Sequence, residues 1–481
     1  MLDYGKYEAV IGLEVHAQLN TLTKIFAADE TAFGALPNTH ISPITLGMPG
    51  VLPKLNKEVV DKAIKFGLAC NSEISQQTFF ARKNYFYADL PKGYQISQDN
   101  NPICVGGFIE INDTGVKKKI RLHHAHMEED AGKNNHELHA DFSLIDLNRA
   151  GVPLLEIVSE PDMHTPDEAY AYLHEIRKLV RYIDICDGNM EEGSLRCDAN
   201  ISIRLKGESI LNTRVEVKNM NSIRHVKKAI ENEIKRQIDL VESGGEVVQE
   251  TRSFHAEDGS SFVLRSKENA HDYRYFPEPD LPPVLISNEK LEQLKSTMPP
   301  LPNALFLQFT QAYHLSEQDA VMLTEDRDTA YFFLDMIRHS SNYKAVSNWL
   351  NGEIKSYLND NHLKITDLKL RPEQLGEIIM LLDENKINST GAKTIFYHLL
   401  ENTNQTALQA AESLNLMQSS DKDELTLWAT QVLESMPDKV AEYKKGKKGT
   451  INLFVGNVMK LSKGKAAPKQ ITQILEDLLS K

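Results

Sequence analysis

The chain has 481 residues, of which 41% are apolar and 25% charged, and its formal net charge is −14 at neutral pH. This composition predicts a soluble globular protein of about three domains, and no apolar run reaches the roughly 18 residues that a membrane span needs. Four scattered cysteines and an N-terminus without a basic, apolar leader predict a cytoplasmic protein with reduced thiols and no membrane partner.

The first regular segment is residues 10–19, where polar and apolar side chains alternate. Alternation with a period of two predicts a half-buried strand. Its polar face carries Glu14, His16 and Gln18, and its apolar face carries leucine, valine and alanine. An ordinary half-buried strand also alternates, so this segment is informative only together with the similar strands described below.

Residues 81–98 combine three cations with four aromatic side chains. Arg82 and Lys83 are suited to phosphate oxygens. The aromatic side chains either stack on a base or fill a core, and the sequence leaves both interpretations open.

Residues 123–133 gather three histidines and three acidic residues. Carboxylates with an imidazole suit Mg²⁺ or Mn²⁺, although an edge strand that runs into a polar turn would look the same. Alternation places His126 and Glu128 on one face and Glu129 on the other. The spacing therefore does not decide which glutamate points into a site.

Glu156 interrupts an otherwise apolar strand at residues 154–158. A buried carboxylate needs a cation or a full set of hydrogen bonds, so Glu156 is either the partner of an arginine or a ligand. A helix follows at residues 165–182, because Thr165 is a good N-cap and Pro166 fits the first helical position.

Two more alternating strands follow, at residues 196–205 and 213–220. Their polar faces carry Arg196, Asp198, Asn200, Ser202 and Arg204, and Arg214, Glu216 and Lys218. Together with residues 10–19 they predict one sheet whose open face is charged and suits oxyanions and a metal ion. A second helix at residues 222–242 ends before two glycines.

Proline-rich segments at residues 276–283 and 298–302 mark a stiff boundary, and the pattern beyond them is helical. We predict domains at residues 1–295, 296–405 and 406–481. Residues 441–481 hold nine lysines and three acidic residues, a local charge of +6 that leaves −20 on the rest. This asymmetry indicates either a local contact with a polyanion or a solvated lysine face. The candidate contacts are Lys447, Lys448, Lys460, Lys463 and Lys465.

Six segments together resemble one family, the B subunit of the aspartyl/glutamyl-tRNA amidotransferase. They are residues 10–19 (VIGLEVHAQL), 82–87 (RKNYFY), 126–133 (HMEEDAGK), 191–200 (EEGSLRCDAN), 272–280 (DYRYFPEPD) and 454–460 (FVGNVMK). The resemblance runs nearly end to end, and the segments are long and in the expected order.

The resemblance implies an α+β fold: an N-terminal cradle with an antiparallel sheet distantly similar to glutamine synthetase, an all-α helical domain, and a small YqeY-like tail that binds tRNA. It implies a carbon–nitrogen ligase that uses ATP and Mg²⁺ to amidate Glu-tRNA(Gln), Asp-tRNA(Asn) or both through an acyl phosphate. Its partners would be a glutamine-hydrolysing amidase (A) subunit, which supplies ammonia, and a small C subunit, in a heterotrimer.

For individual residues, the resemblance implies that Glu14, His16 and Glu129 bind the metal and that Lys83 and Asp198 handle nucleotide and phosphate. The strand-face argument alone adds Arg196 and Glu216 as catalytic candidates. Many relatives have a Cys-Pro-x-Cys zinc pair where this chain reads Ser-Pro-Ile-Thr at residues 42–45, so we predict no structural zinc.

Two rival interpretations remain. A stand-alone carboxylate–ammonia ligase acting on a free small molecule would leave the basic tail unexplained. A non-catalytic scaffold that binds tRNA would leave the acidic, histidine and arginine faces unexplained.

Overall fold

The computed structural model describes residues 4–98, 100–113, 115–135, 139, 141–266, 273–419, 421–462 and 464–480. The chain forms two units, Met1–Leu301 and Pro302–Lys481. The first unit ends six residues beyond the predicted boundary at 295, because Met298 and Leu301 pack against its core.

The first unit is built on a ten-stranded sheet. From one edge to the other its main path is β15 (Ser261–Ser266), β14 (Glu250–Phe254), β13 (Val215–Lys218), β12 (Leu195–Leu205), β1 (Tyr7–Gln18), β11 (Pro153–Ser159), β8 (Val116–Glu129), β6 (Cys104–Val105) and β2 (Glu73–Ile74). A further strand, β7 (Phe108–Asp113), pairs with β8. All these pairs are antiparallel except β13 with β14.

Three small sheets hold the other strands among the described residues of this unit. They are β16 (Phe276–Pro277) with β4 (Ala81–Asn84) and β5 (Tyr94–Ser97), β9 (Lys133–Asn135) with β10 (Leu144–Asp146), and β3 (Gln77–Thr78) with β17 (Val284–Leu285). The first of these contacts β8 through β5 and so lies beside one end of the large sheet.

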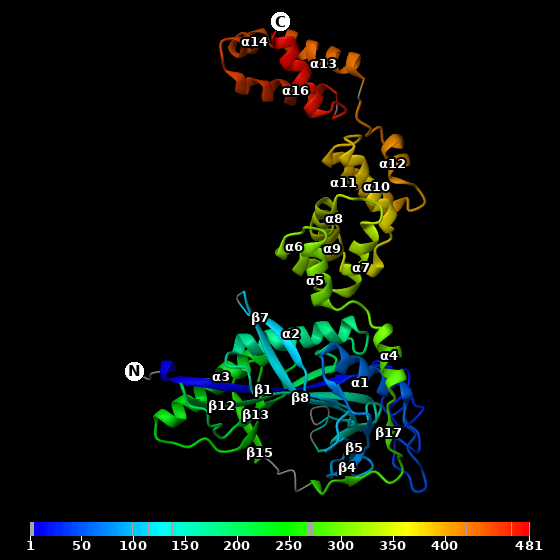
Figure 1. The fold of residues 1–481 in the computed structure, drawn as a ribbon, viewed down its shortest axis with the longest axis vertical. Coiled ribbons are helices and arrows are strands. Elements are labelled where there is room, and N and C mark those ends of the chain that lie inside the picture. Colours follow the sequence, from blue (N-terminus) through cyan, green and yellow to red (C-terminus); the bar gives the residue numbers. More distant parts are fainter. Residues whose placement is uncertain are drawn as a thin grey trace. The chain divides into compact units, whose positions relative to one another are not determined.

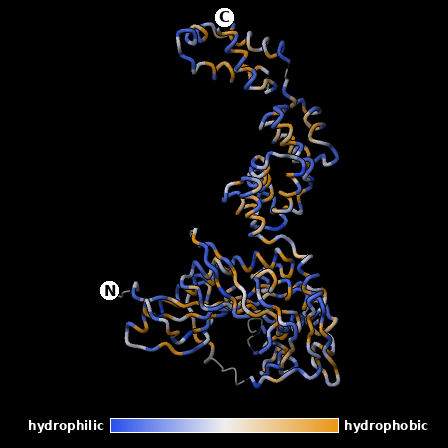
Figure 2. The backbone as a smooth tube through the Cα atoms, viewed as in Figure 1, coloured by the Kyte–Doolittle hydropathy of each residue, from blue (hydrophilic) through white to orange (hydrophobic). Residues whose placement is uncertain are grey.

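One face of the large sheet is covered by helices. α2 (Pro166–Tyr182) and α3 (Ile223–Glu242) pack on each other and on β1 and β12, as Figure 1 shows, while α1 (Lys57–Ala69) packs against β8 and α4 (Asn288–Ser296). The covered face of β1 carries Leu13, Val15 and Ala17, all at most 1% exposed. Figure 2 shows that hydrophobic and hydrophilic residues are interspersed along the whole chain. The predicted mixed α+β class is confirmed.

Local sequence explains where the two long helices begin. The hydroxyl of Thr165 accepts a hydrogen bond from the Glu168 amide at 3.0 Å, and that of Ser222 accepts from the His225 amide at 3.1 Å. Such side-chain caps satisfy amide groups that have no partner within the helix. Both predicted helices are therefore confirmed to within a residue.

The second unit is built from helices. They are α5 (Pro302–Gln311), α6 (Glu317–Leu323), α7 (Arg327–Met336), α8 (Tyr343–Trp349), a π-helical turn (Leu350–Ile354), α9 (Lys355–Asp360), α10 (Pro372–Asp383), α11 (Ser389–Glu401), α12 (Ala407–Ser413), α13 (Lys422–Ser435), α14 (Pro437–Lys444), α15 (Ile451–Leu461) and α16 (Pro468–Ser480). The last four enclose a core of their own that includes Phe454 and Leu475, whereas α12 packs on α10 and α11. The predicted boundary at residue 405 lies just before α12, whereas the separate core of the last four helices begins with α13.

Candidate functional site: the open face of the sheet

Strand pairing arranges the polar side chains of the open face in rows. His16 on β1 lies opposite Glu156 on β11 and Arg196 on β12, and Glu156 lies opposite His126 on β8. Two residues away along each strand, Glu14 of β1 lies opposite Asp198 of β12. Since side chains two residues apart share a face, these rows form one continuous polar surface.

Glu14, His16 and Glu156 come together as a candidate metal centre. One ligand atom from each lies within 4.8 Å of the others. Nε2 of His16 lies within hydrogen-bond distance of Oε2 of Glu156, at 3.2 Å, and 3.7 Å from Oε1 of Glu14. Two carboxylates and an imidazole are a donor set that fits Mg²⁺ or Mn²⁺.

The charged groups that lie close together in this cluster shift the pKa values of Glu14 and His16. The neighbouring Glu156 carboxylate and burial raise the pKa of Glu14 to about 7. Burial disfavours the charged form of His16, but its hydrogen bond to Glu156 and the charges of Glu156, Glu128 and Glu14 raise the pKa of His16 to about 9. The cluster thus concentrates negative charge that protons or a cation must balance.

The two neighbouring glutamates of β8 take different roles. Glu128 lies on the open face, 3.6 Å from Nε2 of His126 and 3.7 Å from Nε2 of His16. Glu129 instead forms an ion pair with Lys92 and accepts a hydrogen bond from the Ile96 amide at 2.8 Å. Glu129 is therefore not a member of the group that Glu14 and His16 form with Glu156. The assignment of Glu129 as a ligand stays a prediction.

Cations approach the cluster from two sides. Lys83 on β4 lies 4.9 Å from the Tyr273 ring centre. Burial would lower the pKa of Lys83, but the nearby Tyr275, Glu128 and Glu156 raise it above its usual range. On the other side, Arg196 donates to Asp130 at 2.9 Å, and Gln18 donates to the same carboxylate oxygen at 3.0 Å.

Asp198 and Glu216 meet around a lysine that the predicted site residues did not include. Lys218 donates to Asp198 and lies 3.5 Å from Glu216, which also accepts from Thr251 at 2.8 Å. Burial would lower the pKa of Lys218, but Asp198, Glu216 and Glu14 raise it above its usual range. The alternation of residues 213–220 already placed Lys218 on the polar face, so its signal was present in the sequence.

The basic residues of the tail lie in the second unit. Lys447 lies 3.4 Å from Glu442, and Nζ of Lys448 lies 4.2 Å from the Tyr443 ring centre. Lys460 is in the last turn of α15, and Lys465 follows that helix. Lys463 lies outside the described residues.

Residues 42–45, where the sequence led us to predict no structural zinc, are held by hydroxyl groups. Ser42 and Thr45 both donate to one oxygen of Asp29, Ser42 at 2.8 Å. Among the described residues, the groups that could hold a metal contain no cysteine. The same residues include no helix long and apolar enough to cross a membrane.

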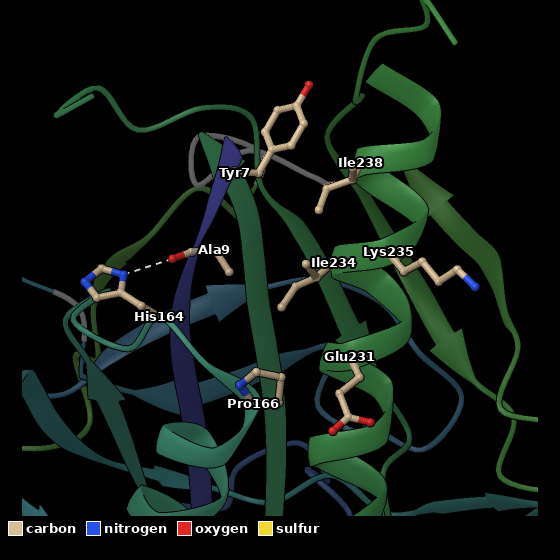
Figure 3. A pocket seen from close by; sticks show the side chains of 8 residues that line it. All are labelled: Tyr7, Ala9, His164, Pro166, Glu231, Ile234, Lys235 and Ile238. Atoms are coloured by element: carbon tan, nitrogen blue, oxygen red, sulfur yellow. Dashed lines mark hydrogen bonds between the residues drawn. The ribbon is translucent and has the colours of Figure 1, made fainter. Parts of the chain in front are cut away.

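A groove of about 540 Å³ lies on the helix-covered side of the sheet. Its lining, drawn in Figure 3, comes from the start of β1, from His164 and Pro166 at the beginning of α2, and from α3 between Glu231 and Ile238. His164 is held there by the Ala9 carbonyl at 2.9 Å. Since the open-face residues above do not line it, this groove is separate from the charged site.

Taken together, the open face has the donor groups that suit a divalent cation and anionic oxygens: a cluster of carboxylates and histidines lies between Lys83 on one side and Arg196 and Lys218 on the other. Such an arrangement suits phosphoryl chemistry, where positioning and charge neutralisation do most of the work.

Comparison with known proteins matches the unit that carries this site to a family of catalytic domains. A family model described as the GatB/GatE catalytic domain matches residues 9–292, and one described as the GatB domain matches residues 331–479. Relatives named as the B subunit of aspartyl/glutamyl-tRNA(Asn/Gln) amidotransferase include those of Bdellovibrio bacteriovorus, 48% identical over 474 residues, and Thermodesulfovibrio yellowstonii, 46% identical over 474 residues. Each alignment covers 98% of this chain and 99% of the relative. The chain belongs to this family, the B subunits of the aspartyl/glutamyl-tRNA amidotransferases.

Proposed function

We propose that this chain catalyses the ATP-dependent amidation of misacylated Glu-tRNA(Gln), Asp-tRNA(Asn) or both. The proposal draws on the printed name of its relatives and on one observation: the ligand cluster of Glu14, His16 and Glu156 lies beside Lys83 and Arg196. Its partners would be an amidase (A) subunit that hydrolyses glutamine and a small C subunit.

In the proposed reaction, a side-chain carboxylate attached to tRNA attacks the γ-phosphorus of ATP. The bond from that phosphorus to the ADP oxygen breaks, and an acyl phosphate forms. Ammonia then attacks the carbonyl carbon, the carbon–oxygen bond to phosphate breaks, and the nitrogen loses a proton. Activation is needed because a free carboxylate is a poor electrophile.

The side chains of the open face divide this work. Glu14, His16 and Glu156 would hold Mg²⁺, which when bound neutralises phosphate charge. Lys83 and Arg196 would bind phosphate oxygens, and Asp130 positions Arg196 through their hydrogen bond of 2.9 Å. Lys218 would help to bind the phosphate, while Asp198 and Glu216 orient its amine.

The test uses the complex of this chain with its partner subunits, supplied with ATP, Mg²⁺, ammonium chloride and Glu-tRNA(Gln). We expect the wild-type complex to form Gln-tRNA and Glu156→Gln to lose at least 100-fold in rate. His255→Ala, which changes an exposed histidine of the same unit, is the control and should retain full activity.

Equal rates for wild type and Glu156→Gln would refute the assignment of this step to the open face and favour the scaffold interpretation. Amidation of free glutamate at a similar rate without tRNA would favour the stand-alone ligase instead.

A further inference from the structure

A second group of metal-binding side chains lies beside the first on the open face. One ligand atom each from His124, His126 and Glu156 lies within 4.8 Å of the others. We propose that these residues form a second cation site, which takes a transition-metal ion such as Zn²⁺ and shares Glu156 with the site of Glu14 and His16. The proposal does not depend on the reaction proposed above.

The two imidazole rings are spaced like neighbouring ligands of one ion. Nε2 of His124 lies 3.1 Å from Nδ1 of His126, and the rings are stacked with centres 5.1 Å apart. Two nitrogens that each lie about 2.0–2.1 Å from a tetrahedral Zn²⁺ are roughly 3.3 Å apart. The separation of the two nitrogens thus matches one edge of a tetrahedral ligand shell.

The other nitrogen of each ring has a partner that can keep the ligating nitrogen unprotonated. β8 has an irregularity where the pairing with β11 skips His123, and Nδ1 of His123 lies 2.7 Å from Nδ1 of His124. On His126, Nε2 lies 3.6 Å from Glu128, which is not one of the proposed ligands. Histidine ligands in proteins generally donate their second ring N–H to such outer partners, which orient the ring.

The donor chemistry separates the two sites. Two imidazoles and one carboxylate favour Zn²⁺ and similar borderline ions, whereas two carboxylates and one imidazole suit Mg²⁺ or Mn²⁺. Glu156 belongs to both groups of ligands. A cation bound at either site therefore balances the negative charge of Glu156 for both sites. A protein with both sites would bind two divalent ions per chain in a small part of one sheet face.

The test is direct metal binding by the chelator-treated full-length chain, without ATP or tRNA. We expect equilibrium dialysis to show two Zn²⁺ ions bound per wild-type chain and one per His124→Ala chain. In His124→Ala, the affinity for Zn²⁺ at the site of His124, His126 and Glu156 should fall at least 100-fold. Glu14→Gln should retain the equivalent that His124→Ala loses, and Glu156→Gln should lose both. His255→Ala controls for binding to surface histidines.

Circular dichroism without metal checks that each variant is folded. Two equivalents in both wild type and His124→Ala would overturn the proposal, as would a single wild-type equivalent that Glu14→Gln removes. Because this measurement involves no catalysis, its failure would leave the amidation proposal intact.

Discussion

Replacing Glu129 with glutamine should destabilise the first unit without removing its cation site. The side chains of Glu129 and Lys92 are only 4% and 13% exposed, and they form an ion pair. Removing one partner of a buried pair costs about 3–5 kcal/mol, because the remaining charge stays buried. Glutamine can still accept the hydrogen bond from the Ile96 amide, so we expect a cost of about 3 kcal/mol, at the lower end.

The first unit spans 301 residues, and unfolding entropy near 2.1 cal/mol/K per residue converts this cost to a fall of roughly 5 °C in its melting temperature. Calorimetry of the full chain is the appropriate assay. Both tryptophans, Trp349 and Trp428, belong to the second unit, so their fluorescence does not report on the first.

Two additional measurements complete this test. The double variant Glu129→Gln with Lys92→Met should recover most of the lost stability, since no buried charge is left unpaired. Mn²⁺ affinity of Glu129→Gln should stay within about twofold of wild type. An unchanged melting temperature together with a loss of Mn²⁺ affinity greater than tenfold would refute this reasoning and make Glu129 a ligand, as the family resemblance implied.

Three further outcomes are expected. Asp130→Asn should cost about 2 kcal/mol of stability and raise the KM for ATP, because it weakens a charge-assisted hydrogen bond to Arg196; an unchanged KM would argue against a positioning role. In the double variant Lys447→Ala/Lys448→Ala, the slope of the logarithm of the tRNA association constant against the logarithm of the salt concentration should become less steep by about 1 to 2. Filter binding between 50 and 200 mM salt measures this slope, and an unchanged slope would exclude these phosphate contacts. Burial lowers the pKa of Lys24 to about 8, below its usual 10.5, so the folded state binds fewer protons than the unfolded state between these values. Wild type should therefore gain stability over Lys24→Met as pH rises from 8 to 10 in thermal melts, and a constant difference would contradict this.

Sequence periodicity was sufficient to predict the strands that carry the site. The alternation of residues 10–19 and 196–205 appears as β1 and β12, which pair along almost their whole length with Glu14 opposite Asp198 and His16 opposite Arg196. Alternation predicts which side chains share one face of a strand. In both strands the structure has the predicted polar side chains on one face.

The partners across strands could not be predicted in the same way. Glu156 lies opposite His16 because of the register between β11 and β1, which no local pattern in either strand specifies. Likewise, Lys92 reaches Glu129 from the turn between β4 and β5, a contact between residues 37 positions apart. The sequence marked the carboxylate of Glu156 as unusual, but only the register shows that it lies opposite His16 and His126.

The hydroxyl groups of Ser42 and Thr45 that bind Asp29 have a consequence for how this chain matures. A loop closed by two O–H donors and one carboxylate is complete as soon as the polypeptide folds, without metal delivery or a reducing agent to protect ligand thiols. The four cysteines of the chain are all buried and far less accessible to oxidants than zinc-binding thiolates at a surface would be. We therefore expect the loop at residues 42–45 to fold equally well with and without zinc and under oxidising conditions.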